Sequence, residues 1–151
     1  HPSPPERVNA LKEKVEKMST RPEASAYEKN YHRNISAHRG EWLADQIGGK
    51  EFEVSEMILN RLTDVGFNPA EVEFYKGEMN RVTRKEEDLK KAIGHYKNAI
   101  EINSMYFPPY RALGLIYYKK KVSQFRKYLA KYLQLHPNAK DKAMILSYLD
   151  Q

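Results

Sequence analysis

Apolar residues recur every three to four positions along most of this chain, which is the spacing of one face of an α-helix. No window alternates apolar and polar residues with a period of two, so strands are not expected. The fold is predicted to be all-α, with short connections, so that helices adjacent in sequence pack antiparallel. Helices are expected at about residues 3–18, 24–47, 52–65, 69–84 and 86–102, from 108, from about 122, and at 139–149.

Glycine, proline and capping residues mark the predicted helix ends. Ser3-Pro4-Pro5-Glu6 has the order of a capping box with Pro in the first helical turn, and Asn68-Pro69-Ala70-Glu71 repeats that device. Gly48-Gly49 interrupts the helical pattern, and Gly66 stands where a left-handed C-terminal residue is expected. The helix before Gly66 is marked by apolar positions at Phe52, Met57, Ile58, Leu62 and Val65.

Three similar phrases indicate an internal repeat. "ILNRLTDVGFNP", "YKNAIEINSMYFP" and "LAKYLQLHPNA" each follow an apolar stripe and precede a helix led by Pro or Asn. The closing prolines Pro69, Pro108 and Pro137 lie on average 34 residues apart, which is the period of the tetratricopeptide repeat. We therefore predict a tetratricopeptide-like α-solenoid of about three helix pairs, closed by a capping helix at residues 139–149.

The last two units carry most of the repeat pattern. Tyr110, Leu113, Gly114 and Tyr117 occupy the consensus positions of a first helix, whereas Phe125 stands where a small residue is usual. In the preceding unit the matching residues are Gly77, Ala92, Tyr96 and Ala99, after a longer turn. The two glycines are expected to let each first helix approach its partner closely, with aromatic side chains filling the gaps between hairpins.

A stacked array presents a concave surface lined by its first helices. Phe74, Leu115 and Tyr118 could serve there as binding residues or pack between repeats, and the sequence leaves both interpretations open. Arg81, Arg111 and Lys119 could pair with acidic groups or a terminal carboxylate of a peptide. The residues projected onto this surface are Glu71, Phe74, Glu78, Arg81, Arg111, Leu115, Tyr118 and Lys119.

Composition narrows the class of protein. The 151 residues are 40% hydrophobic and 30% charged, as in a globular domain. No apolar run approaches the roughly 18 residues that a membrane span requires, and the first residues do not read as a signal peptide. The net charge of +6 arises from residues 119–151, since the rest of the chain is balanced. Without a nucleic-acid motif, this basic end favours a solvated helix face over a nucleic-acid site.

Motifs of common enzymes are missing from the sequence. The chain has no Cys and no His-Glu-x-x-His, the pattern that holds zinc in many peptidases. His32 and His38 are six residues apart and point to different faces of a helix. No Gly-x-Ser-x-Gly elbow or phosphate-binding glycine loop occurs, so no catalytic residue, metal ligand or cofactor is assigned to this chain.

The opening residues "HPSPPERVNALKEKV" resemble the end of the catalytic domain of HtpX and CAAX-protease-type zinc metallopeptidases. His1, Pro2, Glu6, Arg7 and Leu11 carry the resemblance. One bacterial branch of that family, the BepA-like envelope proteases, places tetratricopeptide repeats after its protease domain. The closing phrase "YLQLHPNAKDKAMILSYL" is also similar to that branch.

The resemblance implies a domain organisation and a function. Residues 1–22 would be the last helix of a truncated peptidase domain or a linker, and residues 23–151 the repeat domain. The intact parent would be a zinc metalloendopeptidase of the bacterial periplasm or cell envelope, and this chain its protein- or peptide-recruiting part. His1 would lie near the zinc cleft of that parent. A stand-alone repeat scaffold and a binder of nucleic acid or anionic surfaces are the alternative functions, and a cytoplasmic location is the alternative to the cell envelope. The peptide partner, the oligomeric state and the compartment stay open.

Overall fold

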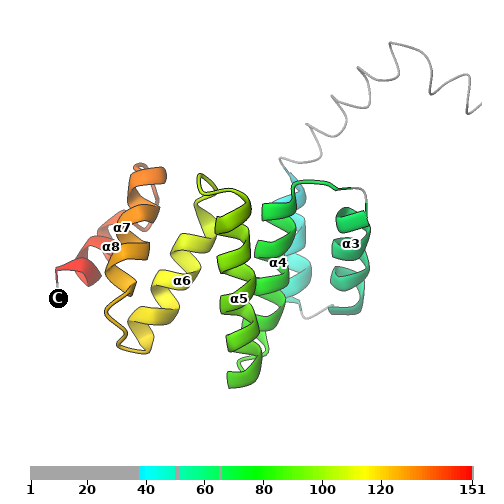
Figure 1. The fold of residues 1–151 in the computed structure, drawn as a ribbon, viewed down its shortest axis with the longest axis horizontal. Helices are drawn as coiled ribbons and strands as arrows, with labels where there is room; N and C mark the ends of the chain where they lie inside the picture. Colours follow the sequence, from blue (N-terminus) through cyan, green and yellow to red (C-terminus); the bar gives the residue numbers. More distant parts are fainter. Residues whose placement is uncertain (1–37, 50–51, 65, 151) are drawn as a thin grey trace, which may run out of the picture. The chain divides into compact units, whose positions relative to one another are not determined.

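The computed structural model describes residues 38–49, 52–64 and 66–150, and these contain helices and turns but no strand. Helices α3 to α8 belong to one compact unit, Leu43–Gln151 (Figure 1). The predicted helix at residues 3–18 and the capping box at Ser3 lie outside the described residues. Residues 38–48 are helical; the other helices are α3 Phe52–Asp64, α4 Pro69–Val82, α5 Glu86–Ile102, α6 Pro108–Lys119, α7 Phe125–Leu135 and α8 Lys142–Leu149.

The helices pair as the repeat pattern predicts. α4 packs along α5, and α6 packs along α7. In addition, α3 contacts α4, α5 contacts α6, and α8 contacts α7. Tyr96, Leu113 and Leu129 are fully buried within one apolar cluster, and Leu43, Leu59 and Val72 within another. Phe74 packs against both clusters. The expected all-α array of antiparallel helix pairs with a closing helix is thus confirmed.

Close approach within each pair depends on the two glycines that the sequence singles out. A Cβ atom added to Gly77 would lie 2.5 Å from a ring carbon of Tyr96, and one added to Gly114 would lie 2.4 Å from Leu129. Such separations are well inside van der Waals contact. Tyr96 and Leu129 therefore pack directly on the backbone of the preceding helix, as a close-packed pair requires.

Several predicted boundaries shift by a few residues. α4 ends at Val82 rather than at Arg84. α7 begins at Phe125 rather than near Val122, because residues 122–124 form turns whose carbonyls accept the first amides of the helix. Of the predicted apolar positions in α3, Ile58 and Leu62 pack against an apolar cluster. Met57 is 65% exposed, whereas Ser55 and Leu59, one turn apart, are buried. Periodicity over this short helix therefore identified its inward face only in part.

The helix caps are formed by backbone geometry more than by side chains. Gly66 has φ +64°, and the amides of Gly66 and Phe67 return to the carbonyls of Thr63 and Leu62, as in a Schellman motif. Asn68 precedes α4 as predicted, but its side chain donates to the Glu71 carboxylate at 2.7 Å instead of capping a backbone amide. The predicted position is therefore right and the predicted capping bond is not formed.

Lys121 occupies a position that normally belongs to glycine. Its φ is +56°, and the Lys121 and Val122 amides close a second Schellman motif on Tyr118 and Tyr117. A left-handed conformation costs a non-glycine residue about 1 kcal/mol. Lys121→Gly is therefore expected to raise the free energy of unfolding by about 0.5–1 kcal/mol, measured by urea denaturation. Lys120→Gly, at φ −82°, is the control and should lower it; equal effects would show that backbone strain at Lys121 is not relieved.

Candidate functional site

The four predicted binding residues on α4 differ in how much they face solvent. Phe74 is half-buried, with its ring centroid 5.2 Å from Tyr75, 5.8 Å from Tyr96 and 5.9 Å from Tyr106. Glu78 accepts a hydrogen bond from the Tyr96 hydroxyl and forms an ion pair with Arg81, whose side chain is 44% exposed. Glu71 accepts the bond from Asn68 described above. On this helix Phe74 packs between hairpins, and Arg81 is the most exposed of the four.

The predicted residues on α6 lie largely against the closing helix and the turn before it. Arg111 donates to the Asp141 carboxylate at 2.6 Å, and Tyr118 stacks on Tyr148 with ring centroids 4.1 Å apart. Leu115 packs against the larger apolar cluster, while Lys119 is exposed. The Tyr132 hydroxyl donates a hydrogen bond of 2.8 Å to the other oxygen of the Asp141 carboxylate.

A cavity of about 510 Å³ lies on another face of α4 and was not predicted from the sequence. It is formed by the end of α3, the α3–α4 turn, the first half of α4 and the last turn of α5. Its walls are mainly apolar, with a few polar and charged groups among them. The lining residues are Leu62, Thr63, Gly66, Phe67, Pro69, Val72, Glu73, Lys76, Asn98, Glu101 and Ile102.

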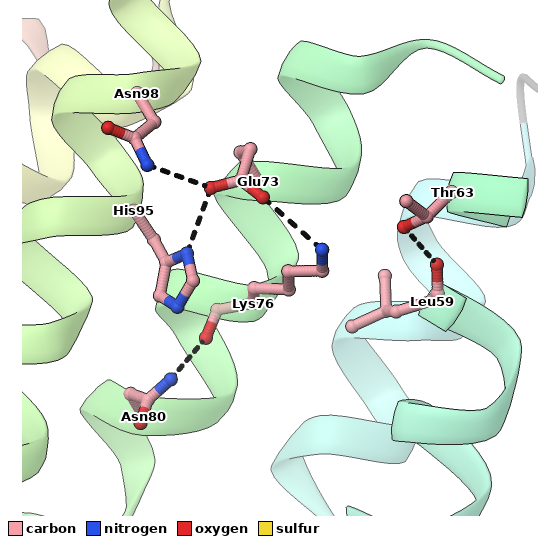
Figure 2. A network of polar contacts seen from close by, with 7 residues as sticks. All are labelled: Leu59, Thr63, Glu73, Lys76, Asn80, His95 and Asn98. Atoms are coloured by element: carbon pink, nitrogen blue, oxygen red, sulfur yellow. Dashed lines mark hydrogen bonds and ion pairs between the residues drawn. The ribbon is translucent and has the colours of Figure 1, made fainter. Parts of the chain in front are cut away.

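Glu73 is the centre of a polar network in the wall of this cavity (Figure 2). One of its carboxylate oxygens lies 2.9 Å from Nδ1 of His95 and 3.3 Å from the amide nitrogen of Asn98, both on α5. The other oxygen accepts from the Lys76 ammonium at 3.3 Å. The Glu73 side chain is 17% exposed and that of Lys76 27%. The network therefore joins α4 to α5 through one half-buried carboxylate.

Comparison of the two repeat units shows which residues line the cavity in the first unit at positions that are apolar in the second. When Gly77 is aligned with Gly114, Glu73 falls on Tyr110 and Lys76 on Leu113. Tyr110 and Leu113 are buried in the apolar cluster of their unit. In the first unit, charged side chains stand at these packing positions, and the space beside them is open. This alignment is the sequence signal that could have revealed the site.

Hydrogen bonds keep Glu73 ionised despite its partial burial. Burial raises the pKa of Glu73, but bonds from His95 and Asn98, the charge of His95 and the bond from Lys76 outweigh it, so the net pKa is lowered. The folded state thus binds a proton less readily than the unfolded state. The stability that this provides is present above the ordinary Glu range, about pH 4.3, and is lost as the pH falls through the lower folded pKa.

Glu73→Gln is expected to lower the free energy of unfolding by about 1 kcal/mol at pH 7, because the charge-assisted bonds are weakened. The difference from wild type should be smaller at about pH 3, below the ordinary Glu range of about pH 4.3, because the stability that comes from the lowered pKa of Glu73 fades as the pH falls. Urea denaturation of both proteins at the two pH values measures this. Glu87→Gln, an exposed acid at the start of α5, is the control. A Glu73→Gln deficit that is the same at both pH values would contradict the prediction.

Comparison with known families identifies the repeat in the middle of the chain. The family described as TPR repeat matches residues 81–121, from the end of α4 to the turn after α6. The fold is a tetratricopeptide-like solenoid. Comparisons with curated proteins and with solved structures find no match.

Two further features of the solenoid bear on function. Among residues 38–49, 52–64 and 66–150, no group of three or more His, Cys, Asp or Glu side chains is arranged to hold a metal ion. Of the helices in that part of the chain, none has the length and apolarity needed to cross a membrane.

Proposed function

We propose that this chain is a protein- or peptide-binding module. The observation that carries the proposal is the stacking of α4–α5 on α6–α7, with Gly77 and Gly114 seated against their partner helices. Tetratricopeptide-like arrays of this kind use their stacked hairpins to present extended surfaces to other proteins. The exposed charges of Arg81 and Lys119 and the cavity beside Glu73 are the features open to a partner.

The proposal extends to a larger protein by resemblance. The likeness of residues 1–15 to the end of an HtpX-type catalytic domain supports a module that delivers protein substrates to a zinc metalloendopeptidase of the bacterial periplasm or cell envelope. In that arrangement the zinc would be held by the peptidase domain, and this chain would contribute binding alone. The coding sequence upstream of His1 tests this extension. A His-Glu-x-x-His in the same reading frame within about 200 codons supports it, and an initiator codon adjacent to His1 removes it in favour of a stand-alone scaffold.

The binding function can be tested with the 151-residue chain as bait for a library of displayed random linear peptides. We expect enriched peptides that bind the purified chain with micromolar affinity, as measured by calorimetry with synthetic copies. Arg81→Ala and Lys119→Ala should weaken peptides that use the predicted concave surface, whereas Lys91→Ala, on the exposed side of α5, serves as the control. Failure to enrich any sequence over the empty support would count against a peptide-binding module.

The same chain should also be titrated with single-stranded and duplex DNA at two salt concentrations. Binding of nucleic acid depends on phosphate neutralisation and weakens steeply with salt. We expect weak binding at low salt that disappears near physiological salt. Binding that persists there would favour the basic residues after Lys119 as the functional surface and would contradict a peptide-specific module.

A further inference from the structure

The cavity between α3, α4 and α5 has the composition of a side-chain binding pocket. We propose that it binds a Lys or Arg side chain, flanked by an aliphatic residue, from a segment of a partner protein. This inference rests on the proposed function and adds to it a site and a ligand class. The proposed site is on the face of α4 that carries Glu73, roughly 140° around the helix from Glu78. It is therefore not on the predicted concave surface.

The charges in the pocket favour a cation. Glu73 and Glu101 both line it, against the single ammonium of Lys76. Lys76 and Glu73 are paired with each other, so their charges offset one another and the carboxylate of Glu101 supplies the uncompensated charge. Glu101 is exposed at the pocket and would repel an anion. The net charge of the lining is therefore −1 at neutral pH, and a guanidinium or ammonium group is the complementary ligand.

The apolar walls specify what accompanies the cation. Leu62, Val72 and Ile102 line the cavity together with Phe67, and Ile102 is 50% exposed. The stem of a Lys or Arg side chain can lie along such walls while its charged end reaches a carboxylate. A volume of about 510 Å³ accommodates one long side chain and an aliphatic neighbour, and it falls within the range of small-ligand pockets.

The energetics of the pocket also indicate a function. Half-buried charged groups at packing positions stabilise a fold less than the apolar residues that fill the equivalent positions beside Gly114. Departures from efficient packing are expected at functional sites. Here such a departure lies beside an open cavity, as expected for a binding site. Glu73, held in place by His95 and Asn98 from α5, is oriented before any ligand arrives, which lowers the entropic cost of binding.

The proposal is tested with the peptide acetyl-Ser-Leu-Lys-Leu-Ser-amide and two analogues that carry Glu or norleucine in place of Lys. Each is titrated into the isotope-labelled 151-residue chain and followed by amide chemical shifts. We expect the Lys peptide to shift amides of the pocket residues and to bind at least about fivefold more tightly than the Glu analogue, with the norleucine peptide between them.

Substitutions in the pocket give opposite expected effects. Glu73→Gln and Glu101→Gln should each lower the affinity for the Lys peptide about fivefold. Ile102→Ser should lower the affinity for all three peptides. Lys76→Met keeps the aliphatic stem and removes the competing cation, so it should tighten the Lys peptide about fivefold. Glu87→Gln is the control and should leave binding unchanged. Far-ultraviolet circular dichroism and thermal melting check each variant, and the exposed Glu101 keeps the test valid if Glu73→Gln perturbs folding.

Each remaining outcome overturns the pocket proposal. Preference for the Glu peptide, shifts confined to α6 and α8, or weaker binding by Lys76→Met would each do so, as would no binding of any of the three peptides. The proposed peptide-binding function of the chain is tested separately from the pocket. If library peptides bind but are insensitive to Glu73→Gln and Glu101→Gln, the binding module stands and the pocket is not its site.

Discussion

Gly114→Val is expected to lower the free energy of unfolding by about 3 kcal/mol, at the upper end of the cost of overpacking a core. A Cβ atom at this position would lie 2.4 Å and 2.6 Å from two carbons of Leu129 and 3.2 Å from its backbone nitrogen. Leu129 is fully buried, so it has little room to move away. The two helices would have to separate. Urea denaturation followed by circular dichroism measures the change.

Gly94 provides the matched control for this substitution. It lies within α5, is exposed, and has nothing within 4 Å of the position that a Cβ atom would occupy. Gly94→Val is expected to change stability by less than about 0.5 kcal/mol, in the stabilising direction, because Val is a slightly better helix former than Gly. Similar losses at Gly94 and Gly114 would show that close approach of α6 and α7 is not what Gly114 provides.

Leu129→Ala is expected to lower the free energy of unfolding by about 3 kcal/mol, because it empties a fully enclosed site. Leu129 is 0% exposed and packs on Gly114. Gly114→Ala in the Leu129→Ala background should then be close to neutral, since the new methyl group enters the space that Leu129 left. The coupling between the two positions is expected to exceed about 1 kcal/mol.

The double-mutant cycle is completed by urea denaturation of the wild type, both single variants and the double variant. Leu146→Ala is the control for loss of a Leu side chain, because Leu146 is 42% exposed and its truncation should cost less than about 1 kcal/mol. Additive losses at positions 114 and 129 would contradict direct packing between them. Such a result would also weaken the account of the α6–α7 pair as a glycine-seated hairpin.

The repeat pattern predicts which residues lie on the concave surface, but it does not show what those residues contact. The pattern projected Arg111 and Tyr118 onto that face, and in the structure they contact Asp141 and Tyr148 from the closing segment. Phe74 packs between the two apolar clusters. Which of these residues also contact a partner is a matter for the peptide experiments. Arg81 and Lys119 have the most exposed positions for that role.

The sequence by itself determined the helices from Phe52 onward, the pairing of neighbours and the two close-packed glycines. These features depend on local rules: apolar spacing, the left-handed freedom of Gly66, and proline at the start of α4 and α6. Because these rules act within a few residues, a single sequence is sufficient to apply them. These rules identified the inward face of α3 only in part: Ile58 and Leu62 pack inward, but Met57 is exposed and Leu59 is buried.

Only the tertiary structure decided where a pocket opens and which charges line it. Glu73 and His95 are 22 residues apart in sequence, and their contact depends on the crossing of α4 and α5. Leu62 and Ile102 face the same cavity from helices that the sequence does not place relative to each other. Periodicity gives the direction of a side chain around its own helix. The neighbour that it meets is set by how several helices share one interior, which is a property of the packed chain as a whole.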